Sequence, residues 1–323
     1  MRPALSVVAF TVLSGAGLGV LVIAACMDVA HAAGLIDRWP SAWWLRIGAT
    51  GLALVVAGLC ASTLHLGNPK QAWRSLSRWR SSWLSREALV AIALLPIAAL
   101  WTVAVHFDAF QGARVIVAIL TVCLAWTMLH CTAMIYASLK PIRQWHTRRV
   151  PLAYLLLGHA SGALVVVAIL RAHGEPAAAL SIVAGVLLLL AAGVKLDYYT
   201  FIAGSSRRLT IEQAIGVPQG VHPPVPGGNA MRARIFDVGH SKGTFLTNEF
   251  GYTLAPAQRT ALRLLLWVGV FLIPALWLAS GRAGWPGAVL ACGTCLLGLV
   301  AERWMFFAEA RHTVRLYHGD RTT

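Results

Sequence analysis

Eight apolar segments of about 20 residues each constrain what this chain of 323 residues can fold into. In a bilayer every backbone polar group must be satisfied internally, so a segment of this length is expected to be a helix. The segments are continuous rather than alternating, which disfavours a transmembrane β-barrel. We predict an all-α polytopic membrane protein with eight transmembrane helices in two four-helix bundles. The predicted helices lie near residues 5–27, 44–66, 87–106, 115–137, 151–171, 177–198, 261–280 and 285–307.

The composition excludes several other classes of protein. Hydrophobic residues make up 58% of the sequence and charged residues 12%, whereas a soluble domain carries about 25% charged residues. A cytosolic globular enzyme and a disordered chain both need more charge. The first apolar run, near residues 4–27, exceeds the roughly 7–15 residues of a signal-peptide core, so we expect a retained helix. We interpret Cys292 and Cys295, despite their C-x-x-C spacing, as packing residues rather than a redox or metal pair.

Basic residues outnumber acidic ones, 27 to 12, and they are sorted by loop. Such an excess can indicate nucleic-acid binding in a soluble protein, but in membrane proteins it collects in cytoplasmic loops. Twenty-one of the basic residues lie on the side that holds both termini and the loops after the second, fourth and sixth segments. The opposite side carries five, namely Arg38, Arg46, Arg114, Arg171 and Arg282. We predict no nucleic-acid partner, and a bacterial inner membrane protein with both termini in the cytoplasm.

The stretch from residue 199 to 260 is the longest segment outside the predicted helices. It contains a cluster of prolines and glycines, which argues against a folded domain of its own. Loops of this length are usually either disordered or functional. Aromatic residues lie among its basic residues at Phe236, Phe245, Phe250 and Tyr252. We predict one long cytoplasmic loop, residues 199–260, that docks partner subunits.

The string His65-Leu-Gly-Asn-Pro69 ends the second predicted helix and is the most informative polar motif. Gly67 and Pro69 stop a helix and fix a tight turn, and a histidine there can exchange a proton near physiological pH. The third predicted helix begins at Glu87, where a carboxylate suits a helix N-terminus. His65 and Glu87 should therefore meet at one membrane face. The residues alone leave open a structural explanation, in which His65 caps a helix and Glu87 pairs with Arg86.

The chain between these two positions is both basic and aromatic. The basic and aromatic residues of this stretch include Lys70, Trp73, Arg74, Arg78, Trp79 and Arg80. At headgroup level the basic groups can favour negative charge on a ligand, contact an acidic partner or bind lipid headgroups.

Other ionisable residues inside the predicted helices have simpler explanations. His130 and His159 could ligate a haem, since two histidines from facing helices are the usual b-type arrangement, but we favour hydrogen-bonded histidines within the bundle. We expect Glu302 and Arg303 to form a buried ion pair or bundle contacts rather than a proton relay.

The segment between His65 and Glu87 resembles the anchor subunits of dimethyl sulfoxide reductase, a family of eight-helix membrane proteins. The resemblance is carried by the string His65–Pro69, by Ala72, Ser75 and Leu76, and by the onset Ser85-x-Glu87. The C-terminal segment 301–307 is similar to the final helix of that family. Although the loop 199–260 departs from the best-known members, its segment 247–252 resembles a proteobacterial branch associated with quinone-linked sulfite oxidation.

This resemblance implies a three-part complex. A molybdopterin subunit would carry out the substrate chemistry, a four-cluster iron–sulfur subunit would conduct electrons, and the anchor would exchange them with ubiquinone or menaquinone. The family's anchor has no haem, and its quinone-site histidine and glutamate fall on His65 and Glu87. We therefore expect no metal in this chain. We predict a quinone site at His65, Gly67, Pro69, Arg74 and Glu87, with partner or headgroup contacts at Lys70, Arg78 and Arg80.

The sorting of charge favours one direction of electron flow. It places the 67–86 loop in the cytoplasm, which fits the sulfite-oxidising branch, with electrons passing from sulfite through molybdenum and iron–sulfur clusters to the quinone. In that scheme the chain is the quinone-reactive subunit and is not catalytic on its own. The alternatives are an anchor that oxidises menaquinol for a dimethyl-sulfoxide-reductase-type complex, a b-type cytochrome anchor, and a permease or scaffold without a redox role.

Overall fold

The computed structural model describes residues 3–37, 39–64, 69–204, 209–215, 252–282 and 284–318. These residues are almost entirely helical, and the β pairing among them is an isolated antiparallel bridge between Ile142 and His312. Within these ranges, eight helical runs are long and apolar enough to span a membrane. The predicted all-α fold class with eight transmembrane helices is confirmed.

The spans are formed by ten helical elements, because the seventh span has three parts. The first six are α1 (Leu5–Ala32), α2 (Ser41–Thr63), α3 (Trp83–His106), α4 (Gln111–Ala137), α5 (Arg149–Ala172) and α6 (Ala178–Ala203). The seventh consists of α9 (Pro256–Leu266), the π-helix η3 (Trp267–Leu272) and α10 (Ile273–Ser280), and the eighth is α11 (Trp285–Ala308). Among the described residues, three short elements lie outside the spans: η1 (Pro69–Arg78), α7 (Ile211–Ala214) and η4 (Thr313–His318).

Two helices extend further than their apolar runs, so the predicted loop from 199 to 260 is shorter at both ends. α6 continues to Ala203 and α9 begins at Pro256. The predicted runs already contained Lys195 and Arg263, and in the bundle these cations pair with Glu302 and Glu309, respectively.

Most of the predicted docking loop falls outside the described residues. These gaps are residues 205–208 and 216–251, which include Phe236, Phe245 and Phe250. The described parts are α7 and the short extended segment from Tyr252 that leads into α9. The docking role of this loop stays a prediction.

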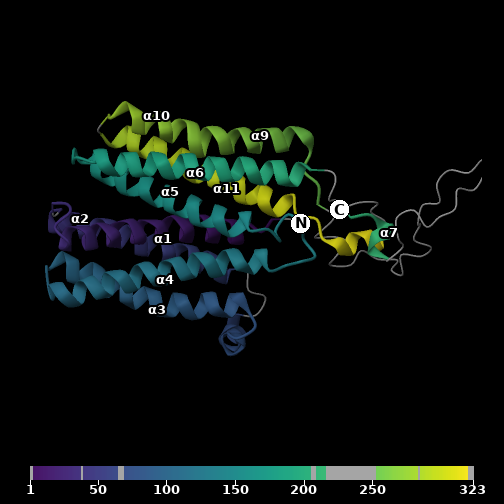
Figure 1. Ribbon diagram of the computed structural model, residues 1–323, viewed down its shortest axis with the longest axis horizontal. Coiled ribbons are helices and arrows are strands. Elements are labelled where there is room, and N and C mark those ends of the chain that lie inside the picture. Colours follow the sequence, from purple (N-terminus) through teal and green to yellow (C-terminus); the bar gives the residue numbers. More distant parts are fainter. Residues whose placement is uncertain are drawn as a thin grey trace, which may run out of the picture.

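The long helices run side by side in an elongated bundle (Figure 1). The start of α1, the C-terminal segment, α7 and the α4–α5 connection lie at one end, which we call the terminal end (Figure 1). The connection between α1 and α2 lies at the opposite, far end. Both described termini are therefore on one side of the membrane span.

α1 lies at the centre of the bundle. It packs against α2, α4, α5 and α11, and 72% of its most apolar window is buried, compared with 28% for α2 and α6. α1 and α5 are thus interior helices, whereas α2 and α6 face lipid. Because α1 packs on both sides, the contacts do not divide cleanly into two four-helix bundles, and that subdivision stays a prediction.

Glycines allow the backbones of α1 and α5 to touch. A Cβ atom added at Gly19 would lie 2.0 Å from the carbonyl oxygen of Gly158, and one added at Gly162 would lie 2.2 Å from the carbonyl carbon of Gly19. Backbone atoms cannot move aside as a flexible side chain can, so these positions admit no side chain without separating the helices. Small residues that permit such close approach are a common basis of helix packing in membranes.

Two arginines at the far end are turned into the protein. Arg114 is 2% exposed and pairs with Asp28 (3.2 Å) and Asp108 (2.6 Å), and the indole of Trp101 also donates to Asp28 (3.0 Å). Arg171 is 7% exposed and donates to the Ser181 hydroxyl and to carbonyls at the end of α10. These two cations are held by contacts within the bundle rather than exposed in the loops of the far end.

Candidate functional site

Glu87 is buried between α3 and α4. Glu87 is 4% exposed, and the hydroxyl of Thr132 in α4 donates a hydrogen bond to the Oε1 atom of Glu87. Arg86 does not pair with it: Arg86 stacks on Trp83 at 4.3 Å and donates to the carbonyls that precede α3. The structural alternative of a capping acid paired with Arg86 is therefore wrong.

Glu87 lies near the terminal end of the bundle. α3 begins at Trp83, where the Ser82 hydroxyl accepts from the amide of Ser85 (3.4 Å). Glu87 follows Trp83 by four residues, or about 6 Å along the helix axis. A carboxylate at this depth within a span is costly and is a functional candidate by default.

The other predicted quinone-site residues cannot be assembled around Glu87. His65 and Gly67 lie outside the described residues, and Pro69 starts η1 without a described side chain. Arg74 is exposed and stacks over Trp73 at 5.7 Å, and it forms no ion pair or hydrogen bond with Glu87 in the described structure. The site therefore stays a prediction.

The predicted contact residues in η1 and just after it are exposed. Lys70, Arg78 and Arg80 are exposed, and Trp73 and Trp79 are 68% and 50% exposed. η1 packs against α3, so this basic and aromatic surface stands beside the start of the helix that carries Glu87.

A buried cluster of charges lies at a similar depth and was only partly predicted. Glu302 and Arg303 of α11 form the expected ion pair at 3.2 Å. Lys195 of α6, which the sequence analysis did not assign to this cluster, binds the other oxygen of Glu302 at 2.6 Å. The three residues are at most 4% exposed. In the sequence, the one indication of this contact is that Lys195 is followed within one helical turn by two tyrosines. In the structure the Lys195 ammonium lies 4.4 Å from the Tyr198 ring and 5.0 Å from the Tyr199 ring.

Tyrosines surround this charge cluster. The Arg303 guanidinium lies 3.6 Å from the ring centre of Tyr154, which stacks in turn on Tyr136 of α4 at 6.1 Å. The hydroxyls of Tyr154 and Tyr198 are buried without a hydrogen-bond partner among the described residues. Both tyrosines line a cavity of about 10 Å³, which is close to the size of one water molecule.

The two histidines considered as haem ligands differ in their surroundings. His159 is hydrogen-bonded at both ring nitrogens: Nδ1 to the Leu155 carbonyl (2.7 Å) and Nε2 as acceptor from the Trp126 indole (2.8 Å). His130 is exposed on α4 and packs edge-on against Trp83. The hydrogen-bonded interpretation of His159 is confirmed.

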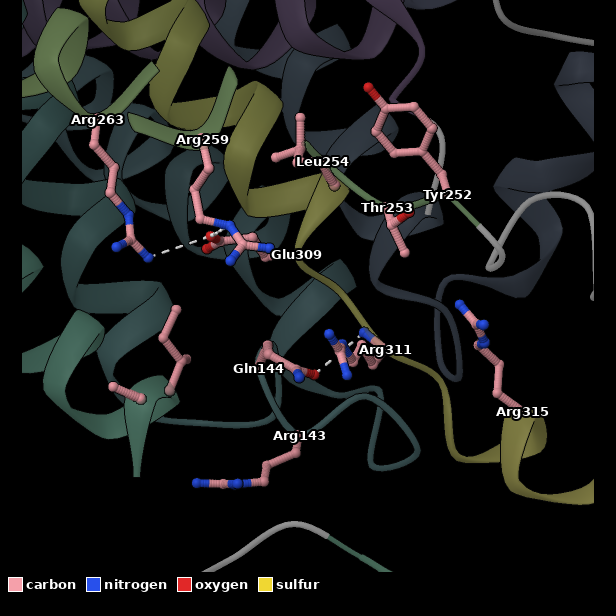
Figure 2. A pocket seen from close by; sticks show the side chains of 13 residues that line it. Arg143, Gln144, Tyr252, Thr253, Leu254, Arg259, Arg263, Glu309, Arg311 and Arg315 are labelled. Carbon is pink, nitrogen blue, oxygen red and sulfur yellow. Dashed lines mark hydrogen bonds and ion pairs between the residues drawn. The ribbon is translucent and has the colours of Figure 1, made fainter. Parts of the chain in front are cut away.

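The terminal end also contains a pocket of about 320 Å³ that sequence reasoning missed (Figure 2). Among the described residues, five arginines and one carboxylate line it: Arg143, Arg259, Arg263, Arg311, Arg315 and Glu309. They come from the α4–α5 connection, α9 and the segment after α11, so no short sequence motif could have indicated the pocket.

Comparison with known proteins places the whole chain in one family. Residues 1–308 match the model of the DMSO reductase anchor subunit (DmsC) family. The chain belongs to this family. The C subunit of sulfite dehydrogenase from Allochromatium vinosum is 32% identical over 334 residues, which cover 98% of this chain and 99% of that protein. The anaerobic dimethyl sulfoxide reductase chain YnfH of Escherichia coli K12 is 29% identical over 157 residues, which cover 47% and 51% respectively. No solved structure matches the chain.

The family assignment fixes the general role of the protein. It is a multi-pass membrane anchor subunit of a molybdoenzyme complex, which implies catalytic and iron–sulfur partner subunits. This confirms the resemblance noted in the sequence, including the sulfite dehydrogenase branch, because the relative from that branch matches along the full length.

Proposed function

We propose that the chain is the quinone-reactive anchor of a sulfite-oxidising complex at the cytoplasmic face of a bacterial inner membrane. The observation that carries the proposal is the buried carboxylate of Glu87, held by Thr132 near the terminal end of the bundle. The relative from sulfite dehydrogenase covers nearly the whole chain, whereas the dimethyl sulfoxide reductase relative covers less than half. This difference favours sulfite as electron donor over menaquinol oxidation.

The chain's own groups suit a site where a quinone takes up protons. Reduction of a quinone by two electrons consumes two protons, and a positioned carboxylate or imidazole can pass them. Glu87 lies about 6 Å from the start of its helix, close to the membrane surface from which protons would be supplied to a bound quinone. Thr132 fixes one oxygen of the carboxylate through its hydroxyl. His65 follows the end of α2 and would supply the second group.

The distribution of cations supports a cytoplasmic terminal end. Five basic residues were assigned from the sequence to the side opposite the termini, and two of them, Arg114 and Arg171, are buried in the bundle. Only Arg38, Arg46 and Arg282 then remain as basic residues of the far-end loops. The terminal end therefore carries an even larger share of the loop cations, as expected for the cytoplasmic side of a membrane protein. The partner subunits would then dock beside η1 and deliver electrons at that face.

Glu87→Gln tests the proposal in the purified complex. We expect sulfite:quinone turnover to fall by about 10²–10⁴-fold, which is the rate enhancement that a positioned general acid or base usually contributes. Sulfite oxidation with a soluble dye should stay unchanged, because that assay bypasses the quinone. His65→Gln should behave in the same way.

Asp197→Asn provides the matched control. Asp197 is a carboxylate near the same end of the bundle whose side chain is 55% exposed and pairs with Arg149, so its loss should leave both assays intact. The proposal fails if Glu87→Gln lowers dye-linked and quinone-linked activity equally, or if quinone turnover is unchanged. Replacing sulfite with quinol plus an S-oxide in the same preparation tests the opposite direction of electron flow.

A further inference from the structure

The small cavity beside the buried charge cluster is lined by polar atoms that the protein itself does not satisfy. Tyr154, Tyr198 and Glu302 line this cavity together with Lys195 and Arg303. The hydroxyl oxygens of both tyrosines and the Oε2 atom of Glu302 are buried and have no hydrogen-bond partner within the described structure. Buried polar atoms are rarely left without a partner, because burial without a hydrogen bond costs free energy. Three such atoms on residues that line one cavity indicate a bound polar ligand.

The ion pairs of Glu302 leave room for this ligand. Lys195 donates to the Oε1 atom of Glu302 at 2.6 Å. The Nε atom of Arg303 lies 3.2 Å from Oε2, but this contact lacks the alignment of a hydrogen bond. Each carboxylate oxygen has two lone pairs, so Oε2 can still accept a hydrogen bond from a ligand.

The size and position of the cavity suit one small molecule. Its volume of about 10 Å³ is close to that of a single water. The rest of the described lining is apolar and consists of Val150, Ala153 and Phe306. The three unsatisfied atoms belong to α5, α6 and α11, so one ligand between them would join three helices.

The charges around the cavity favour a neutral ligand that both donates and accepts. A cation would meet the ammonium of Lys195 and the guanidinium of Arg303, whereas an anion would meet the carboxylate of Glu302. Water can donate to Oε2 of Glu302 and accept from both tyrosine hydroxyls. Three hydrogen bonds are the usual number for a buried water.

A second cavity of similar size, between α1, α5 and α11, offers fewer partners. Tyr154 and Arg303 border this cavity as well, and so do Thr11 and Ser161. The hydroxyls of Thr11 and Ser161 already donate to carbonyl groups of their own helices. The observations therefore favour the cavity that also has Tyr198 and Glu302 on its lining.

We propose that the cavity between α5, α6 and α11 binds one ordered water molecule. The water donates to Oε2 of Glu302 and accepts from the hydroxyls of Tyr154 and Tyr198. It thereby extends the ion cluster into a hydrogen-bonded network that connects three helices within the membrane. This site is separate from Glu87, so the proposal does not depend on the proposed function.

Tyr154→Phe and Tyr198→Phe test the proposal by the sign of their effect. Each variant removes a hydroxyl but keeps the ring that lies against Arg303 or Lys195. If water is bound, each variant deprives it of one hydrogen bond, and the thermal midpoint of the purified complex should fall by roughly 2 °C. If the cavity is dry, each variant removes an unsatisfied buried hydroxyl and should raise the midpoint.

The double variant Tyr154→Phe/Tyr198→Phe measures whether the two hydroxyls share one ligand. Loss of the first hydroxyl loosens the water, so loss of the second should cost less, and the combined shift should be smaller than the sum of the single shifts. Tyr199→Phe is the matched control, because its ring also lies against Lys195 but is not part of the cavity lining. We expect this control to leave the midpoint unchanged.

A cryo-electron microscopy map of the complex that resolves buried waters provides a direct observation. We expect density within hydrogen-bond distance of the two tyrosine hydroxyls and of Oε2 of Glu302. This measurement uses the wild-type protein, so it decides the question even if a variant fails to assemble. A map that shows other buried waters but none here would refute the proposal.

Three results with the variants would also overturn it. The first is a raised or unchanged midpoint in either single variant, which would indicate a dry cavity. The second is additive shifts in the double variant, or an equal shift in Tyr199→Phe, which would show that the hydroxyls do not share a ligand. The third is a wild-type midpoint that falls when gluconate replaces chloride while the double variant does not respond, which would identify chloride as the ligand.

Discussion

Gly19→Ala should remove most of the correctly assembled protein from the membrane. The added methyl group would lie 2.0 Å from the carbonyl oxygen of Gly158, and neither backbone can yield without moving a whole helix. α1 and α5 form the interior of the bundle, so their separation would also disturb α4 and α11. Overpacking of a well-packed core costs about 1–3 kcal/mol and occasionally more, and a clash between two backbones falls at the upper end. The yield of monodisperse complex in fluorescence-detected size-exclusion chromatography measures this loss.

Gly15→Ala is the matched control on the same helix. An added Cβ atom at Gly15 meets no heavy atom within 4 Å, and alanine is about 0.5–1 kcal/mol more favourable than glycine inside a helix. We expect this variant to assemble at least as well as wild type. Equal losses at both positions would show that helix contact does not explain the requirement for glycine.

Glu302→Gln should be the most destabilising change among the buried charges. It leaves Lys195 and Arg303 as two cations in a region where all three residues are at most 4% exposed. Breaking a buried ion pair by removing one partner costs about 3–5 kcal/mol, because the charge that is left has lost its compensation. The thermal midpoint of the purified complex should fall accordingly.

The arrangement predicts an order for the related variants. Lys195→Met leaves the neutral pair of Glu302 and Arg303 intact, and we expect a loss of less than about 1 kcal/mol because an apolar side chain replaces a buried charge. The double variant Lys195→Met/Glu302→Gln leaves one cation, Arg303, stacked on Tyr154, and it should be intermediate between the two single changes. If Lys195→Met is as damaging as Glu302→Gln, the three-residue ion cluster is not the source of stability.

The helices were predictable because lipid imposes a simple rule on length and polarity. Runs of apolar residues led to eight spans, and eight are observed among the described residues. The ends of the helices were less predictable, because α6 and α9 extend past the predicted apolar runs to Ala203 and Pro256. Lys195 and Arg263 inside these helices pair with Glu302 and Glu309, which are distant in sequence, so only the folded bundle shows that these charges are compensated.

The candidate site stays a prediction, and the structure adds a contact that the sequence did not indicate. Glu87 was selected because it opens the third predicted helix and because the quinone-site glutamate of the resembled family falls on it, and the structure adds Thr132 as its partner. Nothing near Glu87 in the sequence indicates Thr132, because the contact depends on how α3 packs against α4. The arginine pocket was missed for the same reason: its five cations come from three separate parts of the chain.

The central position of α1 has a consequence for biosynthesis. Gly19 and Gly158 touch in the folded bundle but are separated by most of the first half of the chain. At about 5–20 residues per second, translation of that interval takes roughly 7 to 28 seconds. During this time the glycine face of α1 has no α5 to cover it, so the earlier helices must hold it in place or an insertion chaperone must shield it. The slowest committed step of assembly should thus be the arrival of the fifth helix, not the insertion of the first.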